Sequence, residues 1–227
     1  MIQNLTKPGK LKIVVVDDHE VMLDGTINAL RQQYPEEEII GATTAQSTLN
    51  QVVKLQPDLV VVDLSIPETL GKTATINTGI QVLKTLIKNY PNLNLVVLSC
   101  YTEALVRIKP EIEAHQGGFL VVDKSRSSKE MLDSVDLALK KEHRIPGKMI
   151  RTEKVNAKWI DLLNCAFQEG LTDRAIAQRL NVAERTVRKY WQEIQKFLDI
   201  DPKKCRAQGK NLRITTKIEA TKKGLLG

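Results

Sequence analysis

Four short runs of aliphatic residues recur in the first half of the chain, at 13–16, 59–62, 95–98 and 119–122. None of them alternates with polar residues, which is the pattern of strands buried on both faces of a parallel sheet. Segments with helical spacing separate the runs. The first half of the chain is therefore predicted to be an α/β domain built on a parallel sheet.

The segments between the runs show where the helices are expected. Apolar positions predict helices around 21–30, 48–54 and 80–87. A fourth helix, over about 103–115, is poorly marked because Pro110 falls inside it. Ser127 followed by Glu130 makes a capping box for a fifth helix. The apolar face of this fifth helix is formed by Met131, Val135 and Leu139.

Polar residues follow the four runs. Asp17 and Asp18 follow the first, Asp63 the second and Ser99 the third, and Lys124 comes after Asp123 at the end of the fourth. The carboxyl ends of parallel strands line up at one edge of an open sheet, where ligands bind. Carboxylates gathered there repel one another unless a cation shares the site, and oxygen ligands alone favour Mg²⁺. The residues at the four strand ends together predict one site that binds a phosphoryl group on an Asp.

Each of these residues also has an ordinary explanation when taken alone. An Asp directly after a strand is often only the N-cap of the next helix. A single Ser is more often a capping hydroxyl than a catalytic one, and a single Lys is usually a solvated surface charge. Polar residues follow all four apolar runs, in chain order and separated by helical segments. This recurrence favours a single site formed by these residues together.

The motifs Val-Val-Val-Asp-Asp-His at 14–19 and Asp-Leu-Ser-Ile-Pro at 63–67, with Ser99 and Lys124, resemble the receiver domain of two-component response regulators over about residues 10–141. The resemblance implies a five-stranded, doubly wound parallel sheet of the flavodoxin-like type. It also implies that Asp63 accepts phosphate from a sensor histidine kinase. Beyond phosphorylating and dephosphorylating itself, such a domain is not expected to be an enzyme.

The same resemblance assigns roles to the other residues. Ser99 would turn inward to bond a phosphoryl oxygen, and Lys124 would pair with that group. The implied Mg²⁺ ligands are Asp18, Asp63, the backbone carbonyl of Ser65 and, through a water molecule, Asp17.

Two features depart from the family pattern. The Gly that opens the helix after the acceptor Asp matches Gly79, which comes about eight residues later than usual, so 68–78 is predicted to contain an insertion beside the site. With Lys124 as the family's lysine, the aromatic switch position holds Val121, and Phe119 lies one pleat further back.

Charge is divided unevenly along the chain. Residues 1–148 contain 17 Lys or Arg and 18 Asp or Glu, whereas residues 149–227 contain 17 and 9. The net charge of +7 therefore lies in the last third. A length of 227 residues fits one or two domains, and the charge step favours two. The second is predicted to bind nucleic acid or an acidic surface, after a linker at 142–156.

Residues 157–227 have the apolar spacing of a small all-α bundle. Two helices joined by a tight turn at Asn181, the second of them basic, suggest a helix-turn-helix. Motifs at 172–177, 180–182 and 186–188 resemble the four-helix DNA-binding domain of NarL/FixJ/LuxR-type regulators, with 212–226 as the fourth helix. The resemblance implies double-stranded DNA as a partner and a homodimer as the active form.

On the predicted recognition helix, Val187, Trp191 and Ile194 are needed for the core. The outward side chains, predicted to contact DNA, are Arg185, Arg188, Lys189, Gln192 and Lys196. Arg and Gln can read guanine and adenine edges, while Lys mostly meets phosphate. The basic connection 201–211 is expected to be either a solvated loop or an additional contact to phosphates.

No signal peptide and no apolar run of membrane-spanning length is recognisable, so no membrane partner is expected. Cys100, Cys165 and Cys205 are odd in number and lack metal-ligand spacing, which indicates reduced thiols. The chain is predicted to be cytoplasmic.

These features predict a phosphorylation-controlled transcription regulator. Two alternatives stay open: an orphan regulator controlled by a partner or ligand, and a stand-alone aspartyl phosphatase with Asp63 as nucleophile. Such phosphatases keep an Asp two residues after the nucleophile as general acid. Ser65 stands at that position and the basic C-terminal region has no use in a phosphatase, so this alternative is disfavoured.

Overall fold

The structure is a computed structural model that describes residues 10–144 and 157–226. The chain divides into two compact units. The first unit, described over 10–102 and 110–144, holds the sheet, and the second, described over 103–109 and 157–226, holds the C-terminal helices. Most of the predicted linker at 142–156 lies outside the described residues.

The first unit is built on a parallel sheet with the strand order β2-β1-β3-β4-β5-β6. The strands are β1 (Lys12–Val16), β2 (Glu38–Ala42), β3 (Leu59–Val62), β4 (Asn94–Leu98), β5 (Phe119–Val122) and β6 (His143–Arg144). The four aliphatic runs form β1, β3, β4 and β5, as predicted. The strand order reverses at β1, whose two neighbours are β2 and β3. Such a reversal opens a crevice at the carboxyl ends of the strands, where ligands bind.

The sheet contains the five predicted parallel strands and one additional strand, β6. The additional strand, β6, has only two residues, which pair in parallel with Phe119 and Leu120 at the edge of β5. Both residues of β6 are exposed. No apolar pattern therefore marked it in the sequence.

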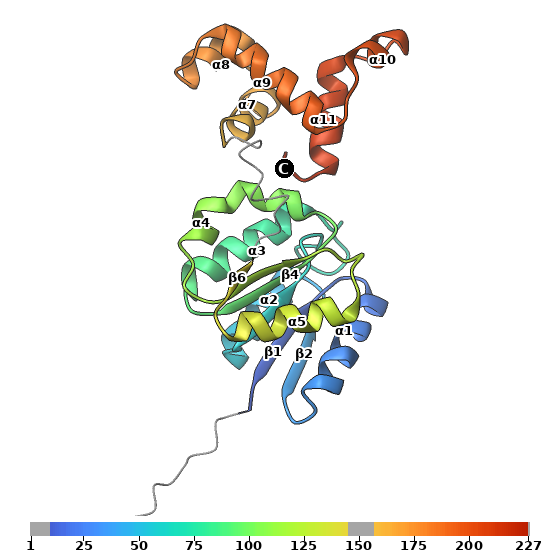
Figure 1. Cartoon of the computed structure of the whole chain (residues 1–227), viewed down its shortest axis with the longest axis vertical. Helices are drawn as coiled ribbons and strands as arrows, with labels where there is room; N and C mark the ends of the chain where they lie inside the picture. Colours follow the sequence, from blue (N-terminus) through green and yellow to red (C-terminus); the bar gives the residue numbers. More distant parts are fainter. Residues whose placement is uncertain (1–9, 145–156, 227) are drawn as a thin grey trace, which may run out of the picture. The chain divides into compact units, whose positions relative to one another are not determined.

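Helices cover both faces of the sheet (Figure 1). In the first unit they are α1 (Glu20–Gln33), α2 (Ala45–Leu55), α3 (Ile76–Asn89), α4 (Lys109–Glu113) and α5 (Ser128–Leu139). The 3₁₀ helix η1 (Thr102–Ile108) precedes α4 in the chain, and its residues 103–108 belong to the second unit. On one face, Leu23 and Ile27 of α1 and Val135 of α5 pack on the sheet. The Ser127 hydroxyl accepts a hydrogen bond from the Glu130 N–H at 3.3 Å and caps α5.

Two details of the predicted helices are corrected. The expected helix over 103–115 is divided into η1 and the short α4, with Pro110, which has no N–H to donate, at the second position of α4. On α1, Val21 and Met22 are exposed, so the apolar face of this helix begins at Leu23.

The second unit contains α7 (Ala157–Phe167), α8 (Asp173–Arg179), α9 (Glu184–Phe197), α10 (Pro202–Ala207) and α11 (Leu212–Lys222). Their core includes Trp159, Leu162, Ile176, Val187, Trp191, Ile194 and Ala220. Asn181 has a positive φ of 52° in the turn between α8 and α9. The connection at 201–211 is not an irregular loop, because it contains α10, and the last helix ends at Lys222 rather than Leu226. No helix among the described residues is both long and apolar enough to span a bilayer.

Candidate functional site

Two adjacent strands bring buried carboxylates to the crevice. Asp17 follows β1 and is 3% exposed, and Asp63 follows β3 and is 4% exposed. Val16 and Val62, the residues before them, are partners in the parallel register. The Oδ1 atom of Asp17 accepts the His19 N–H at 3.0 Å, and that of Asp63 accepts the Leu64 N–H at 2.6 Å. The main chain thus fixes both carboxylates side by side.

Lys124 bridges these two carboxylates. Its Nζ lies 2.6 Å from Asp17 Oδ2 and 2.7 Å from Asp63 Oδ2. Burial lowers the pKa of Lys124, but the hydrogen bonds to the two carboxylates outweigh it, so the pKa is raised above its usual value. The lysine is therefore charged at neutral pH and offsets one of the two negative charges of these buried acids, which would be costly to leave unpaired. Its contact with Asp17 was not predicted.

Asp18 provides an oxygen atom that suits a metal. Its Oδ1 is buried and accepts no hydrogen bond from the described residues, although His19 Nδ1 lies 3.0 Å away. One ligand atom from each of Asp17, Asp18 and His19 can be chosen so that all lie within 4.8 Å of one another. A buried carboxylate oxygen that accepts no hydrogen bond, beside a second carboxylate, fits a hard cation with oxygen ligands, such as Mg²⁺.

Ser99 and Ser65 complete the predicted set. Ser99 follows β4, the neighbour of β3, and is fully buried. Its hydroxyl oxygen accepts the Tyr101 N–H at 3.2 Å, which orients it at the strand end. Ser65 is half-buried, two residues after Asp63. All the predicted residues of the receiver site therefore follow the ends of β1, β3, β4 and β5.

The predicted insertion forms an excursion between β3 and α3. Ile66 and Thr75 close it with an antiparallel bridge. The carbonyl oxygens of Pro67 and Glu68 accept the first two N–H groups of α2, at 2.9 and 3.1 Å. The insertion is thus fastened to the N-terminus of α2 at the same edge of the sheet as the carboxylates.

Gly79 explains why α3 can lie close to the acceptor. A Cβ atom at this position would be 2.1 Å from the carbonyl oxygen of Leu64, the residue after Asp63. Only a residue without a side chain allows this approach. The contact supports the match of Gly79 to the family's glycine despite its later position in the sequence.

The aromatic residue of β5 lies away from the site. Phe119 is the first residue of β5 and is fully buried, with its ring edge-on to His115 at 6.4 Å between centroids. Val121 is also buried and pairs with Val97 of β4. An aromatic side chain that changes rotamer near Lys124 is therefore not available from β5.

In the second unit, α9 separates buried from outward side chains as predicted. Val187, Trp191 and Ile194 are buried, and the five predicted DNA-contact residues are exposed: Arg185, Arg188, Lys189, Gln192 and Lys196. Arg188 lies 3.9 Å from Glu184, one turn before it along the helix. These side chains form a polar face that is exposed among the described residues of the second unit.

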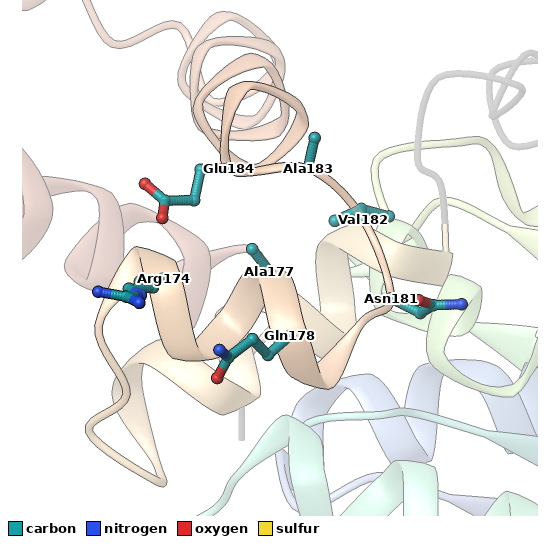
Figure 2. Close-up of a pocket in the computed structure, with 7 residues that line it drawn as sticks. All are labelled: Arg174, Ala177, Gln178, Asn181, Val182, Ala183 and Glu184. Carbon is teal, nitrogen blue, oxygen red and sulfur yellow. The ribbon is translucent and has the colours of Figure 1, made fainter.

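The turn before α9 borders an open hollow of about 500 Å³. Arg174 and Gln178 reach it from α8, and Glu184 reaches it from the first turn of α9 (Figure 2). Basic, amide and acidic groups are thus gathered at the N-terminal end of α9. In helix-turn-helix proteins this end of the recognition helix contacts base edges.

One cluster that positions α9 was missed in the sequence. Asp173 Oδ1 accepts the indole N–H of Trp191 at 3.0 Å and also pairs with Arg213 at 2.5 Å. The Arg213 guanidinium lies 3.8 Å from the centre of the Trp191 ring. The cluster joins α8, α9 and α11, and its members are too far apart in sequence for a spacing pattern to predict it.

Comparison with protein families identifies the first unit. Residues 13–136, more than half of the chain, match the response regulator receiver domain. The chain belongs to the response regulator family. Its acidic residues, Ser99 and Lys124 follow the carboxyl ends of β1, β3, β4 and β5.

Individual relatives extend over both units. The chain is 26% identical to the DNA-binding transcriptional activator DevR/DosR of Mycobacterium tuberculosis, over 79% of this chain and 84% of that protein. It is 24% identical to the transcriptional regulatory protein LiaR of Bacillus subtilis, over 84% and 92%. A structure of RcsB dimers bound to DNA covers 93% of this chain and 99% of that one, with a TM-score of 0.58 and 18% identity. At that identity the match shows a shared fold.

Proposed function

We propose that this response regulator is a transcription regulator controlled by phosphorylation of Asp63. The carrying observation is that Asp63 lies beside Lys124 and the Asp17–Asp18 pair in a chain that also holds a basic helix-turn-helix unit. The relatives named as transcriptional regulators cover most of both units. We assign residues 10–141 to the receiver, 142–156 to the linker and 157–227 to the DNA-binding domain, and we place the protein in the cytoplasm.

The proposed reaction is transfer of a phosphoryl group from a phosphohistidine of a sensor histidine kinase. A bond forms between an Asp63 carboxylate oxygen and phosphorus, while the phosphorus–nitrogen bond breaks and the imidazole nitrogen keeps the electron pair. The Leu64 N–H holds one Asp63 oxygen in place. Lys124 and the Ser99 hydroxyl would then bond the oxygens of the transferred group, so the protein acts by positioning and charge stabilisation.

The carboxylates also fit a magnesium ion. Asp18, Asp63 and the backbone carbonyl of Ser65 would hold it, and Asp17 would bind one of its water molecules. Bound there, Mg²⁺ would neutralise charge on the phosphoryl oxygens. The buried Oδ1 of Asp18, which accepts no hydrogen bond from the described residues, supports this assignment.

The proposed output is binding of double-stranded DNA by a homodimer. Arg185, Arg188 and Gln192 would reach base edges, and Lys189 and Lys196 would reach phosphates. On α11, Ile214 and Ile218 are one turn apart and are 59% and 49% exposed. An exposed apolar pair on the last helix supports contact with a second copy of the chain.

Intact-mass measurement after incubation with acetyl phosphate and Mg²⁺ tests the proposal. One added phosphoryl group that decays slowly is expected. Absence of any adduct would instead favour the orphan regulator, and fast multiple turnover of the donor would favour the phosphatase.

The orphan regulator is the second candidate because of one observation. Phe119 lies at the start of β5, so β5 carries no aromatic side chain next to Lys124 that could report phosphorylation. A receiver without that group could be controlled by a bound partner instead. The phosphodonor experiment separates the two candidates.

A further inference from the structure

The short helix α10 carries the highest density of positive charge in the second unit. Between residues 202 and 218 the chain has six Lys or Arg residues and no Asp or Glu. Lys203, Lys204 and Arg206 belong to α10, and Lys210 follows it. The recognition helix α9 has four basic and two acidic residues over its 14 positions. The strongest local attraction for an anionic partner is therefore at α10.

The helix α10 contains no acidic residue, whereas α9 contains Glu184 and Glu193. All four of them, from Lys203 to Lys210, are exposed. Within residues 10–144 and 157–226, none of them forms an ion pair with a carboxylate. On α9, by contrast, Lys189 lies 3.7 Å from Glu193. The α10 charges can be neutralised by a partner without breaking contacts within the protein.

The main chain of α10 is firmly built. Asp201 caps its start by accepting the N–H groups of Lys203 and Lys204 at 2.8 and 3.3 Å. Pro202 occupies the first turn, where no intrahelical N–H is needed. Cys205 points inward and is buried in the core of the second unit. The basic side chains are therefore presented by an ordered helix, which reduces the conformational entropy lost on binding.

The helix α10 lies next to the C-terminal end of α9, the helix that would enter the major groove of DNA. It follows the C-terminus of α9 after a turn at 198–201, whereas α8 precedes the N-terminus of α9 (Figure 1). A helix of 14 residues is about 21 Å long, and the major groove is about 12 Å wide. With the N-terminal residues of α9 at the bases, its C-terminal end lies beyond the groove. A basic helix at that end would then be near the sugar–phosphate backbone.

We propose that α10 is a second DNA contact, which binds the phosphate backbone beside the groove occupied by α9. This inference rests on the proposed DNA-binding function. A backbone contact carries no sequence information. It therefore raises the affinity for every duplex and leaves the preference for one sequence over another unchanged.

The test compares two double variants of the full chain. Lys203→Gln/Lys204→Gln removes two unpaired charges from α10. The matched control, Arg179→Gln/Lys222→Gln, removes two charges that lie beside Glu169 and Glu219. Binding to a random-sequence duplex is measured across salt concentrations. Each phosphate contact contributes about −0.9 to the slope of log K against log salt concentration. The magnitude of the slope should therefore fall by about 2 in the α10 variant and by much less in the control.

Three results would overturn the inference. Equal slope changes in the two variants would show an effect of net charge alone. An unchanged slope in the α10 variant would exclude contact with DNA phosphates and turn attention to an acidic protein surface. A wild-type protein that binds no duplex would overturn this inference together with the proposed function. Circular dichroism spectra of both variants check that the helices are retained.

Discussion

At the scale of residues, Lys124 determines the state of the site before phosphorylation. Its Nζ lies 2.6 Å from Asp17 and 2.7 Å from Asp63, so it offsets part of their negative charge without a phosphoryl group. When a phosphoryl group arrives, Lys124 can exchange one Asp63 oxygen for a phosphoryl oxygen while it keeps Asp17. This exchange would make the position of Lys124, and of the residues that follow β5, depend on whether Asp63 is phosphorylated.

The positions of Asp17, Asp18, Asp63, Ser99 and Lys124 stood out in the sequence, because each directly follows an apolar run or lies one residue further on, whereas Ser65 came only from the family resemblance. Their exact contacts were not predictable. Lys124 and Asp17 are more than one hundred residues apart in the chain, and their contact depends on the length of the lysine side chain and the order of the strands. That Oδ1 of Asp18 accepts no hydrogen bond from the described residues likewise appears only when the neighbouring atoms are placed.

Substitution of Asp63 by Asn is predicted to abolish phosphoryl uptake and to leave the fold intact. The amide keeps the shape of the side chain but is a poor nucleophile and a weaker metal ligand. Intact-mass measurement with acetyl phosphate and Mg²⁺ checks the prediction, with Asp133→Asn on the exposed side of α5 as the control. Acid-labile phosphate acquired by Asp63→Asn at the wild-type rate would show that Asp63 is not the acceptor.

Substitution of Gly79 by Ala is predicted to destabilise the first unit by about 1–3 kcal/mol, the usual cost of overpacking. The added Cβ would meet the Leu64 carbonyl oxygen at 2.1 Å, so α3 must move away from the acceptor segment. Slower phosphorylation should accompany the loss of stability. Hydrogen exchange of the sheet amides and the rate of adduct formation measure the two effects.

Gly25→Ala is the matched control for this substitution. Gly25 lies in α1, and a Cβ there would have no atom within 4 Å. Alanine is favoured over glycine inside a helix by about 0.5–1 kcal/mol, so this variant should be slightly more stable than the wild type. Similar losses in both variants would contradict the steric explanation.

At the scale of elements, the helices and strands with the clearest sequence patterns were the ones that the sequence predicted. The uninterrupted apolar runs identified four strands, and the helix-turn-helix was recognisable from its turn and its apolar spacing. The two-residue β6 has no such signal and is held by main-chain pairing with β5. The start of α10 was present in the sequence as Asp201-Pro202, a cap followed by a proline, but the dense charge suggested a loop.

The segment between α4 and β5 should make the first unit sensitive to acid. Burial lowers the pKa of His115, a hydrogen bond with the Leu93 carbonyl opposes this, and His143 lowers it further. Nε2 donates to that carbonyl at 2.7 Å, while Nδ1 is buried with no partner among the described residues. A proton at Nδ1 would therefore be buried without an acceptor.

The direction of the pH effect follows from this lowered pKa. The unfolded chain takes up a proton near the ordinary value of 6.5, before the folded protein does. The contribution of His115 to stability is complete above that pH and is lost as the pH falls toward the folded pKa. Thermal midpoints between about pH 5 and 7.5 should show this loss in the wild type and less of it in His115→Gln. Identical profiles for the two proteins would exclude His115 as the cause.

On the recognition helix, Arg188→Ala is predicted to cost roughly 1–3 kcal/mol at a specific site, because a base contact would be lost. Lys203→Ala on α10 should weaken binding to all sequences modestly and lower the salt slope by about one. Titration of both variants against a duplex selected by the wild-type protein and a random duplex makes the comparison. Equal losses on the two duplexes for Arg188→Ala would reassign Arg188 to the backbone.

At the scale of the whole molecule, the charges of the two parts have opposite signs. The net charge is −1 over residues 1–148 and +8 over 149–227. Phosphorylation adds about −1.5 to −2 to the negative part. The positive part matches a DNA partner, and the exposed Ile214 and Ile218 offer a surface for a second copy. Phosphorylation is therefore expected to act on assembly and DNA binding together.

The predicted coupling between the two parts is about 1–3 kcal/mol, which corresponds to roughly 5- to 150-fold in affinity. Met131 and Val135 of α5 are buried in the core that packs on the sheet, and Lys124 follows β5 of that sheet. A shift of Lys124 should therefore change the surface that α5 presents. That face would favour dimerisation, and the dimer would bind DNA more tightly than the monomer.

The most direct test is titration of a selected duplex, with sedimentation of the protein, in the presence and absence of beryllofluoride and Mg²⁺. The account predicts a dimer and a 5- to 150-fold rise in affinity for the wild type, and neither change for Asp63→Asn. Unchanged mass and affinity of the wild type, with occupancy of the site demonstrated by fluorine NMR, would contradict control by phosphate and favour the orphan regulator.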